Sequence, residues 1–129
     1  MLMIQKDIFC CPSVCQQCIG RQVDCRNSSL SFIPNNFSQN TLFLYLSGNN
    51  ISHLNPNALI SLQQLVVLHL DNSGIVYVYP NIFAELKKLW YLQLNNNHIK
   101  YLYPGTFEGL SNLHSLYLQN NEIDFVSEG

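Results

Sequence analysis

Apolar residues recur along this chain at a fixed interval of 24 positions. Leucine or isoleucine holds three columns through successive units, at Leu44, Leu68, Leu92 and Leu116, at Leu46, Leu70, Leu94 and Leu118, and at Ile51, Ile75, Ile99 and Ile123. Other columns keep the same phase, at Leu65, Leu89 and Leu113, at Leu54, Val78, Leu102 and Val126, at Leu62, Leu86 and Leu110, at Leu59, Phe83 and Phe107, and at Pro56, Pro80 and Pro104. A period of this size predicts a solenoid, in which each unit buries its apolar face against the next.

Within each unit the apolar spacing changes midway. In LWYLQLNNNHIKYL, residues 89–102, the apolar positions fit neither the stripe of a helix nor a simple strand alternation. Leu92 and Leu94 are two residues apart, so both point to one side of a short strand, while Tyr91 and Gln93 point to the other side. We therefore expect one short strand per unit, with leucines inward and the alternate residues on an outer, concave face.

An asparagine follows most of these predicted strands. Asn49, Asn97 and Asn121 occupy equivalent positions, and Ser73 takes the place of asparagine in one unit. An amide side chain can pair backbone donors and acceptors that a turn leaves open, whereas a hydroxyl has less reach and fewer donors. The proline beyond each strand predicts a convex side that is irregular or 3-10 rather than regular sheet.

A shorter unit precedes the regular ones. In RQVDCRNSSLSFIPNNF, the core phases fall on Val23, Cys25, Leu30 and Ile33, and the unit is about three residues short of the full period. A solenoid needs a capping unit because an open end exposes its core. Cys25 stands where a core leucine belongs, so we expect it to be buried and bonded to the segment before it.

All the cysteines lie ahead of the regular repeats, at Cys10, Cys11, Cys15, Cys18 and Cys25. Such crowding predicts a disulfide cap formed in an oxidising compartment. Zinc is the alternative because Cys15 and Cys18 form a CxxC pair, but no histidine lies near and the spacing to Cys25 is short for a zinc finger. Cys10 is the odd thiol: it is unpaired, belongs to a removed leader, or reflects a wrong start of the reading frame.

Composition and short motifs indicate the cellular compartment of the protein and argue against some classes of binding partner. The start, MLMIQKDIF, is too short in apolar residues for a signal peptide, so residues 1–10 are expected to be a leader remnant or a disordered N-terminus. Glycosylation triplets at Asn27, Asn36 and Asn50 indicate the secretory route, with an ordinary polar surface asparagine as the alternative at each. The net charge is −2 and only 11% of residues are charged. Nucleic acid and anionic membrane surfaces are therefore poor partners, and no run reaches the length of a membrane span.

The repeat LxxLxLxxNxI and the cysteine cluster resemble one protein family. The stretch CPSVCQQCIGRQVDC, followed by LSFIPNNF, is similar to the cysteine-rich N-terminal cap of extracellular leucine-rich-repeat proteins, and the resemblance extends over residues 11–129. It implies the disulfide pairs Cys11–Cys18 and Cys15–Cys25, with no counterpart for Cys10. It also implies more repeats, a C-terminal cysteine cap and a membrane helix beyond Gly129, hence a cell-surface location with an anchor outside this chain.

The predicted fold is a leucine-rich-repeat solenoid, an α/β-type horseshoe segment with short parallel strands on its concave face. We expect a cap at 11–40, repeats at 41–64, 65–88 and 89–112, and a partial fourth repeat at 113–129.

Aromatic side chains gather among the outward residues of the predicted strands. These residues are Phe43, Tyr45, Ser47, Val67, His69, Asp71, Tyr91, Gln93, Asn95, Ser115, Tyr117 and Gln119, and all except the two serines are candidate partner contacts. A tyrosine-rich surface with few charges suits protein recognition, because rigid amphipathic rings add contact area at low entropic cost. The alternative is that the rings only pack across neighbouring strands and stiffen the sheet. Trp90 must face another way than Tyr91, and we assign it to the strand edge or to partial burial.

The sequence gives little support for catalysis. His69 and Asp71 share the concave side, a pairing that acid–base chemistry can use. No phosphate loop and no recognisable nucleophile motif accompanies them, so we expect no enzyme activity, cofactor or metal. The pair could still tune binding with pH, since histidine changes charge between about pH 5 and 8.

The sequence therefore predicts an extracellular protein-interaction module, the N-terminal part of a receptor or adhesion ectodomain. It would bind a protein ligand or co-receptor through its concave face, and no nucleic acid or small-molecule substrate. A secreted matrix protein of the leucine-rich proteoglycan type and a soluble antigen receptor with variable repeats are the alternatives.

Overall fold

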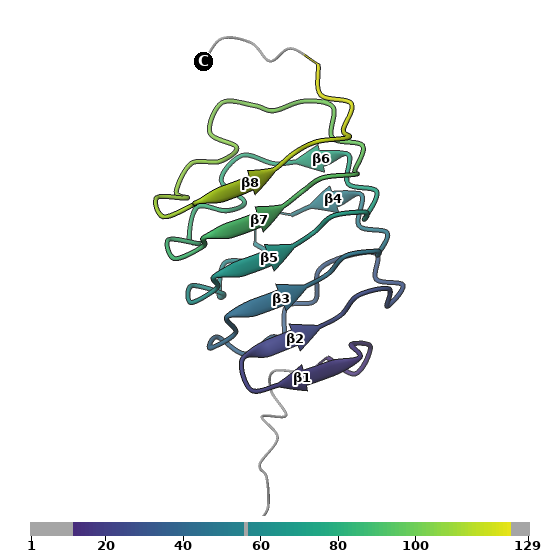
Figure 1. Cartoon of the computed structure of the whole chain (residues 1–129), viewed down its shortest axis with the longest axis vertical. Coiled ribbons are helices and arrows are strands. Elements are labelled where there is room, and N and C mark those ends of the chain that lie inside the picture. Colours follow the sequence, from purple (N-terminus) through teal and green to yellow (C-terminus); the bar gives the residue numbers. More distant parts are fainter. Residues whose placement is uncertain (1–11, 56, 125–129) are drawn as a thin grey trace, which may run out of the picture.

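The structure, a computed structural model, describes residues 12–55 and 57–124, and within them it is built from stacked short strands without helices (Figure 1). One sheet contains β1 (Gln17–Ile19), β2 (Gln22–Asp24), β3 (Phe43–Tyr45), β5 (Val67–His69), β7 (Tyr91–Gln93) and β8 (Ser115–Tyr117). Its six strands lie in the order β1-β2-β3-β5-β7-β8. A second sheet pairs β4 (His53–Leu54) with β6 (Tyr77–Val78).

The register of the large sheet follows the sequence period. Leu68 lies opposite Leu44 on one side and Leu92 on the other, in parallel pairing. These leucines are fully buried, together with the equivalent Leu46, Leu70 and Leu94, and the columns of Ile51 and Ile75, Leu54 and Val78, and Leu62 and Leu86 fill the core behind them. The predicted solenoid is confirmed.

The first turn of the solenoid is closed by an antiparallel hairpin, β1–β2, that the period does not predict. Its second strand continues into the parallel sheet, because Val23 lies opposite Leu44. Cys25 is fully buried and is joined to Cys15, as predicted. Cys18 is also disulfide-bonded, while its predicted partner Cys11 lies outside the described residues. Cys10 and the predicted leader remnant lie outside them too.

The asparagines after the strands form the predicted ladder. The Asn49 Oδ1 atom accepts hydrogen bonds from the backbone N–H groups of Ser28 and Leu30, both at 3.0 Å. Its Nδ2 atom donates to the carbonyls of Cys25 and Leu46 at 2.9 and 2.7 Å. Asn97, two units later, makes the same pattern, and Asn121 repeats part of it. Each amide therefore ties its own turn to the preceding unit.

The convex side is irregular, as the prolines predict. Among the described residues it is made of turns rather than 3-10 helix, and Pro80 and Pro104 are exposed there. Between the ladder turn and this convex side each unit runs through a second extended stretch, and two of these stretches pair as β4 and β6. In Figure 1 this small sheet lies behind the row of large-sheet strands. The prediction missed it because its strands are only two residues long.

Candidate binding face

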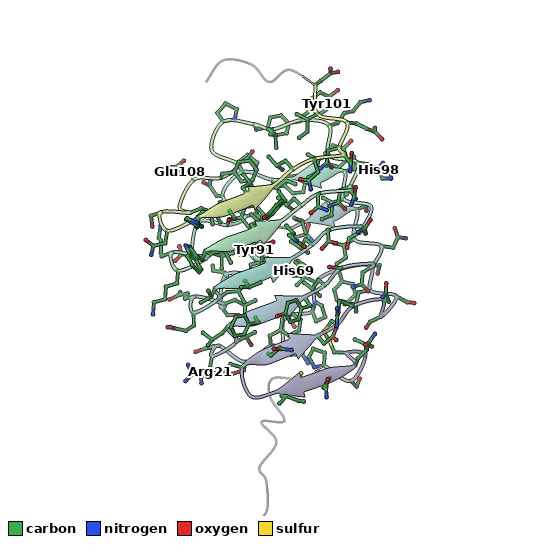
Figure 2. All side chains as sticks on the ribbon, in the orientation of Figure 1. Arg21, His69, Tyr91, His98, Tyr101 and Glu108 are labelled. Atoms are coloured by element: carbon green, nitrogen blue, oxygen red, sulfur yellow. A yellow bond between two sulfur atoms is a disulfide. The ribbon has the colours of Figure 1, made fainter. Side chains whose placement is uncertain are left out.

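The large sheet presents one face to the core and the other, the concave face, away from it. The register places Phe43, Val67, Tyr91 and Ser115 in one row of this face, and Tyr45, His69, Gln93 and Tyr117 in a second row. All eight are partly exposed. A third row just beyond the strands holds Ser47, Asp71, Asn95 and Gln119. Figure 2 shows His69 and Tyr91 in front of adjacent strands, so the predicted outward residues share one surface.

The rings on the concave face contact one another across the strands. The ring centroids of Tyr45 and His69 are 4.9 Å apart, those of His69 and Tyr91 are 5.8 Å apart, and those of Tyr91 and Tyr117 are 5.2 Å apart. Contacts at these distances stabilise the sheet by cross-strand packing. The rings nevertheless remain partly exposed, so they also form a continuous aromatic line open to solvent.

This line extends into the cap through Arg26, which the sequence analysis missed. The Arg26 guanidinium lies over the Tyr45 ring, 5.6 Å from its centroid. Asp24 holds it there with two hydrogen bonds, from Nε to Oδ1 at 2.9 Å and from Nη2 to Oδ2 at 2.8 Å. Asp24 lies opposite Tyr45 in the register. Carrying the repeat phase across the shorter cap unit would have placed both residues on this face.

The concave face carries charge on Asp24 and Arg26 at its cap end and on Asp71 in its third row. The Arg26 guanidinium holds the pKa of the Asp24 carboxyl below its usual value, and the same ion pair raises the pKa of Arg26. Burial lowers the pKa of His69, and Arg26 adds to this, while Asp71 acts in the opposite direction. A hydrogen bond with Tyr91 raises the pKa of Tyr117. Because the pKa of His69 is lowered, its imidazole is mostly neutral at neutral pH.

The Asp71 carboxylate, which the sequence places beside His69 on the concave side, is hydrogen-bonded to other side chains. The Asp71 carboxylate accepts hydrogen bonds from Ser47 Oγ at 2.5 Å and from Asn72 Nδ2 at 3.0 Å. Its carboxylate is thus engaged along its own row instead of orienting the imidazole, as a general base would require. The two residues share a face, as expected, and act there as surface groups.

Asn95 adds an unusual polar atom to the third row. Its Oδ1 atom is buried and has no hydrogen-bond partner within the described residues. An unpaired buried acceptor costs about 1–3 kcal/mol. A ligand donor that reached Asn95 after a small rotation of the side chain would remove that cost, which favours a polar contact at this point of the face.

Trp90 lies beside the concave face and not on it. It precedes β7 and is 54% exposed, which agrees with the strand edge, the first of the two predicted settings. Its indole packs against the His114 ring, with centroids 5.1 Å apart. Its neighbour Tyr91 points to the concave face, which explains the opposite settings of the two adjacent aromatics.

The three asparagines of the glycosylation triplets are all exposed and lie outside the rows of the concave face. Asn27 and Asn50 line one hollow together with Gly48, beside the asparagine ladder. Asn36 lines another hollow near Phe32 and Pro34. Glycans at these positions would leave the aromatic line open.

Two further properties concern metals and membranes. No group of three or more histidine, cysteine or acidic side chains is placed to hold a metal ion in the part of the chain that the structure describes. In the same residues, no helix has the length and apolar character needed to cross a membrane.

Comparison with protein families matches two stretches. A family described as leucine rich repeat matches residues 63–123, and a second description of the same repeat matches residues 40–62. Human leucine-rich repeat-containing protein 70 is 56% identical over 66 residues, which is 51% of this chain and 11% of that protein. Zebrafish leucine-rich repeat-containing G-protein coupled receptor 6 is 45% identical over 58 residues, or 43% of this chain and 6% of the receptor. The chain thus spans a small part of these relatives.

Solved structures share the fold over nearly the whole chain. TLR13, crystallised as a complex with ssRNA13, superposes with a TM-score of 0.81 at 28% identity, covering 88% of this chain and 17% of TLR13. Human 5T4, also called Wnt-activated inhibitory factor 1 or trophoblast glycoprotein, superposes with a TM-score of 0.80 at 29% identity. That match covers 92% of this chain and 44% of 5T4.

Proposed function

Because the chain belongs to the leucine-rich-repeat family, we propose that it is an extracellular module that binds a protein ligand or co-receptor through its concave face. The observation that carries this proposal is the aromatic line from Arg26 through Tyr45, His69 and Tyr91 to Tyr117. Tyrosine and arginine are enriched where proteins bind proteins, because they combine large contact area with hydrogen-bonding groups. The rings of the line are partly exposed and already ordered by their own contacts, which lowers the entropic cost of binding.

A protein ligand fits this face better than a nucleic acid does. The TLR13 structure contains RNA, so a nucleic-acid ligand is one form of recognition seen with this fold. In the present chain the net charge is −2. The carboxylates of Asp24 and Asp71 lie on the concave face, where Arg26 is the cation paired with Asp24. Phosphate binding requires clustered positive charge, and this face does not provide it.

The wider setting that we propose is the N-terminal part of a cell-surface receptor or adhesion ectodomain in the secretory pathway. The stretches GRQVDCRN, FLYLSGNNIS and LYLQNNEIDFV resemble synleurin, a single-pass membrane protein of this family. The Cys15–Cys25 disulfide supports an oxidising compartment. Binding rather than catalysis is the activity that the ring-lined face supports.

The test is a binding screen of the full chain against a library of purified cell-surface ectodomains, followed by variants. Tyr45→Ser and Tyr91→Ser truncate the aromatic line, and Ile60→Ser is the matched control because Ile60 is an exposed apolar residue on the convex side. We expect a partner whose Kd rises about tenfold or more for the two tyrosine variants, as for central interface residues, and stays unchanged for the control. Equal affinity of all three variants would refute the concave site, and RNA binding without an ectodomain partner would refute the ligand class.

A further inference from the structure

A second set of aromatic side chains lies on the flank of the solenoid that carries β4 and β6. We call this set the aromatic flank, and it consists of Phe32, His53, Tyr77, Tyr79, Tyr101 and Tyr103. His53, Tyr77 and Tyr101 are 24 residues apart, as are Tyr79 and Tyr103, and Phe32 precedes the buried Ile33 as His53 precedes the buried Leu54. The phenylalanine and the four tyrosines are between 38% and 60% exposed. Tyr101 is visible in Figure 2 beyond the upper end of the strand row.

The rings of the aromatic flank contact one another in different orientations: His53 is edge-on to two tyrosines, Tyr77 and Tyr79 are stacked at 22°, and Tyr101 and Tyr103 are tilted at 39°. The His53 ring meets Tyr77 at 4.9 Å and Tyr79 at 6.3 Å, with interplanar angles of 82° and 73°. The rings of Tyr77 and Tyr79 are 6.5 Å apart, and those of Tyr101 and Tyr103 are 6.2 Å apart. The rings therefore form an uneven, exposed aromatic surface along the flank. Their mutual contacts hold the rings in place before any ligand arrives.

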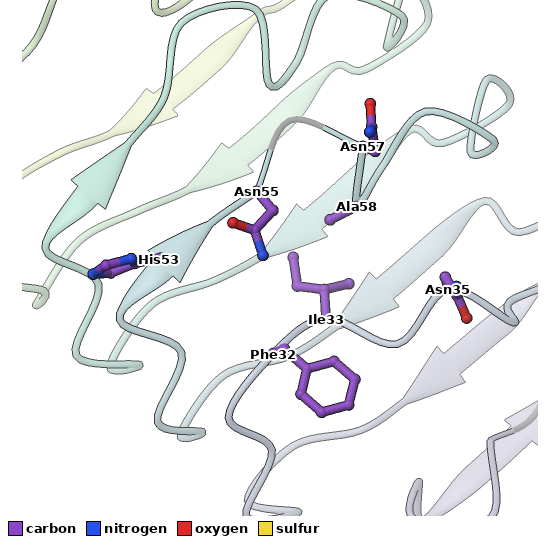
Figure 3. Close-up of a pocket in the computed structure, with 7 residues that line it drawn as sticks. All are labelled: Phe32, Ile33, Asn35, His53, Asn55, Asn57 and Ala58. Atoms are coloured by element: carbon purple, nitrogen blue, oxygen red, sulfur yellow. The ribbon is translucent and has the colours of Figure 1, made fainter.

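One end of the aromatic flank opens into a cavity of about 310 Å³ (Figure 3). Phe32 and His53 stand beside it, and the apolar side chains of Ile33 and Ala58 contribute to its lining. Asn35, Asn55 and Asn57 add exposed amides around it. Apolar lining with a few polar groups is the usual composition of a small binding pocket.

The hydrogen-bonding character of the flank selects the kind of ligand. Its four phenols and three amides can donate hydrogen bonds as well as accept them, and among the described residues no carboxylate, which would repel acceptor oxygens, belongs to the flank or lines the cavity. A ligand with exposed acceptors and few donors complements such a surface. Proline-rich segments meet this description, because proline has no backbone N–H while the carbonyls of a polyproline II helix point to solvent.

The spacing agrees with the same ligand. A polyproline II helix advances about 9 Å in each turn of three residues. Neighbouring parallel strands are about 4.8 Å apart, so one polyproline turn spans about two repeats. Prolines three residues apart can therefore contact the rings of His53 and Tyr101, which hold equivalent positions two repeats apart in sequence. Aromatic-lined grooves are the common receptors for such segments.

We propose that the aromatic flank binds a proline-rich segment in the polyproline II conformation, with one proline ring held in the cavity between Phe32 and His53. This site is separate from the concave face and does not depend on the partner proposed there. The chain would then engage a protein partner on one face and a proline-rich segment of a second protein on the flank.

The test measures binding of N-acetylated deca-proline to the full chain by isothermal titration calorimetry. The double variant Tyr77→Ser/Tyr79→Ser removes two exposed rings of the aromatic flank. The double variant Tyr91→Ser/Tyr117→Ser on the concave face is the matched control. We expect saturable binding that weakens about tenfold or more in the flank variant and less than about twofold in the control. Asn57→Asp provides a second variant that leaves the core untouched, since Asn57 is exposed. Its added carboxylate should weaken binding by repelling the ligand carbonyls.

Three results would overturn the proposal. The first is the absence of saturable binding by the folded protein, with folding verified from its thermal unfolding transition. The second is an equal loss of affinity in flank and concave variants. The third is flank-dependent binding of a neutral oligosaccharide, such as cellohexaose, with no binding of deca-proline.

Discussion

At the scale of single residues, Ser73 shows how the ladder tolerates a substitute. Its Oγ atom lies 3.2 Å from the carbonyls of both Leu46 and Asp71, although one hydroxyl hydrogen can serve only one of them at a time. The backbone carbonyl of Ser73 accepts from Ile51 N–H at 2.8 Å. In the next unit, Asn97 Oδ1 accepts instead from the backbone of Ser73 and Ile75. In the Ser73 turn, the hydrogen bond from Ile51 N–H to the Ser73 carbonyl therefore takes the place of a bond that an asparagine side chain accepts in the other units.

Ser73→Asn should stabilise the fold by about 1 kcal/mol, the net value of one hydrogen bond. The amide would serve both nearby carbonyls and add an acceptor at the position that Asn49 and Asn97 occupy in their units. The free energy of unfolding from a urea titration measures the gain. Asn97→Ser is the reciprocal control and should lose about 1–3 kcal/mol, because it leaves buried backbone groups unpaired. Equal stability of wild type and Ser73→Asn would mean that the bond from Ile51 already satisfies this turn.

At the scale of elements, the turns set how closely successive units approach. Gly109 has φ +94°, and a Cβ atom there would lie 2.5 Å from the carbonyl oxygen of Ala84 in the preceding unit. Gly20, in the β1–β2 hairpin, has φ +61° but open space where its Cβ would be. Comparing the two glycines therefore separates the cost of a left-handed backbone conformation from the cost of crowding between neighbouring units.

Gly20→Ala should cost about 1–2 kcal/mol, which is the penalty of a left-handed conformation for a residue with a side chain. Gly109→Ala should cost about 3 kcal/mol or more, because overpacking against a neighbouring backbone adds to that penalty. Urea titrations of both variants make the comparison, and equal losses would show that the convex turn can shift to make room.

The His69 ring, which lies in β5 of the large sheet, makes the free energy of unfolding depend on pH. Because burial lowers its pKa in the folded chain below the ordinary value of 6.5, the unfolded chain takes up a proton first as the pH falls. The His69 contribution is therefore zero above about pH 7 and becomes destabilising below 6.5. It levels off once the pH is below the folded-state pKa. Asp71 and Arg26 are the charged groups that act on this ring, in opposite directions.

We expect the free energy of unfolding to fall between pH 7.5 and 5.5, and to fall less in His69→Gln. The difference between the two slopes isolates His69 from His53, His98 and His114, which are present in both proteins. Identical slopes would show that the imidazole is hydrated in the folded chain as it is in the unfolded chain.

At the scale of the whole molecule, the 24-residue period predicts the structural features that all units share and misses those that differ from unit to unit. The buried leucines, the asparagine ladder and the rows of the concave face followed from the 24-residue step, because each unit repeats the same backbone path. Arg26 did not, since the cap unit is shorter and shifts the phase. For Trp90 the sequence left two settings open, the strand edge or partial burial, because alternation fixes directions only inside a strand and Trp90 precedes one.

The aromatic flank was missed for a different reason. Its columns are as periodic as those of the concave face, but they lie in stretches whose sheet pairing is confined to β4 and β6. Nothing in the sequence separates such a column from a row of isolated surface rings. The ring contacts and the cavity arise only when the stacked units bring Phe32, His53 and Tyr77 together, so they depend on packing between units.

The last prediction concerns how glycans affect ligand binding at the two proposed surfaces. Asn36 lines the hollow that also contains Phe32 and Pro34, next to the aromatic flank, whereas Asn50 lies in the hollow beside the ladder. In chain secreted from a glycosylating host, Asn36→Gln should therefore bind deca-proline severalfold more tightly than wild type, because a glycan no longer covers the Phe32 end of the flank. Asn50→Gln should bind as wild type does. Intact-mass measurement establishes the occupancy of each site, and titration calorimetry gives the affinities.

The same pair of variants separates the flank from the concave face. A partner bound through Tyr45 and Tyr91 should have equal affinity for Asn36→Gln, Asn50→Gln and wild type, because neither glycan lies in the rows of the large sheet. If Asn36→Gln altered concave binding as well, the two surfaces would be coupled, and the view of two independent sites would fail. If an occupied Asn36 left deca-proline binding unchanged, the ligand could not reach Phe32, and its position on the flank would have to begin at His53.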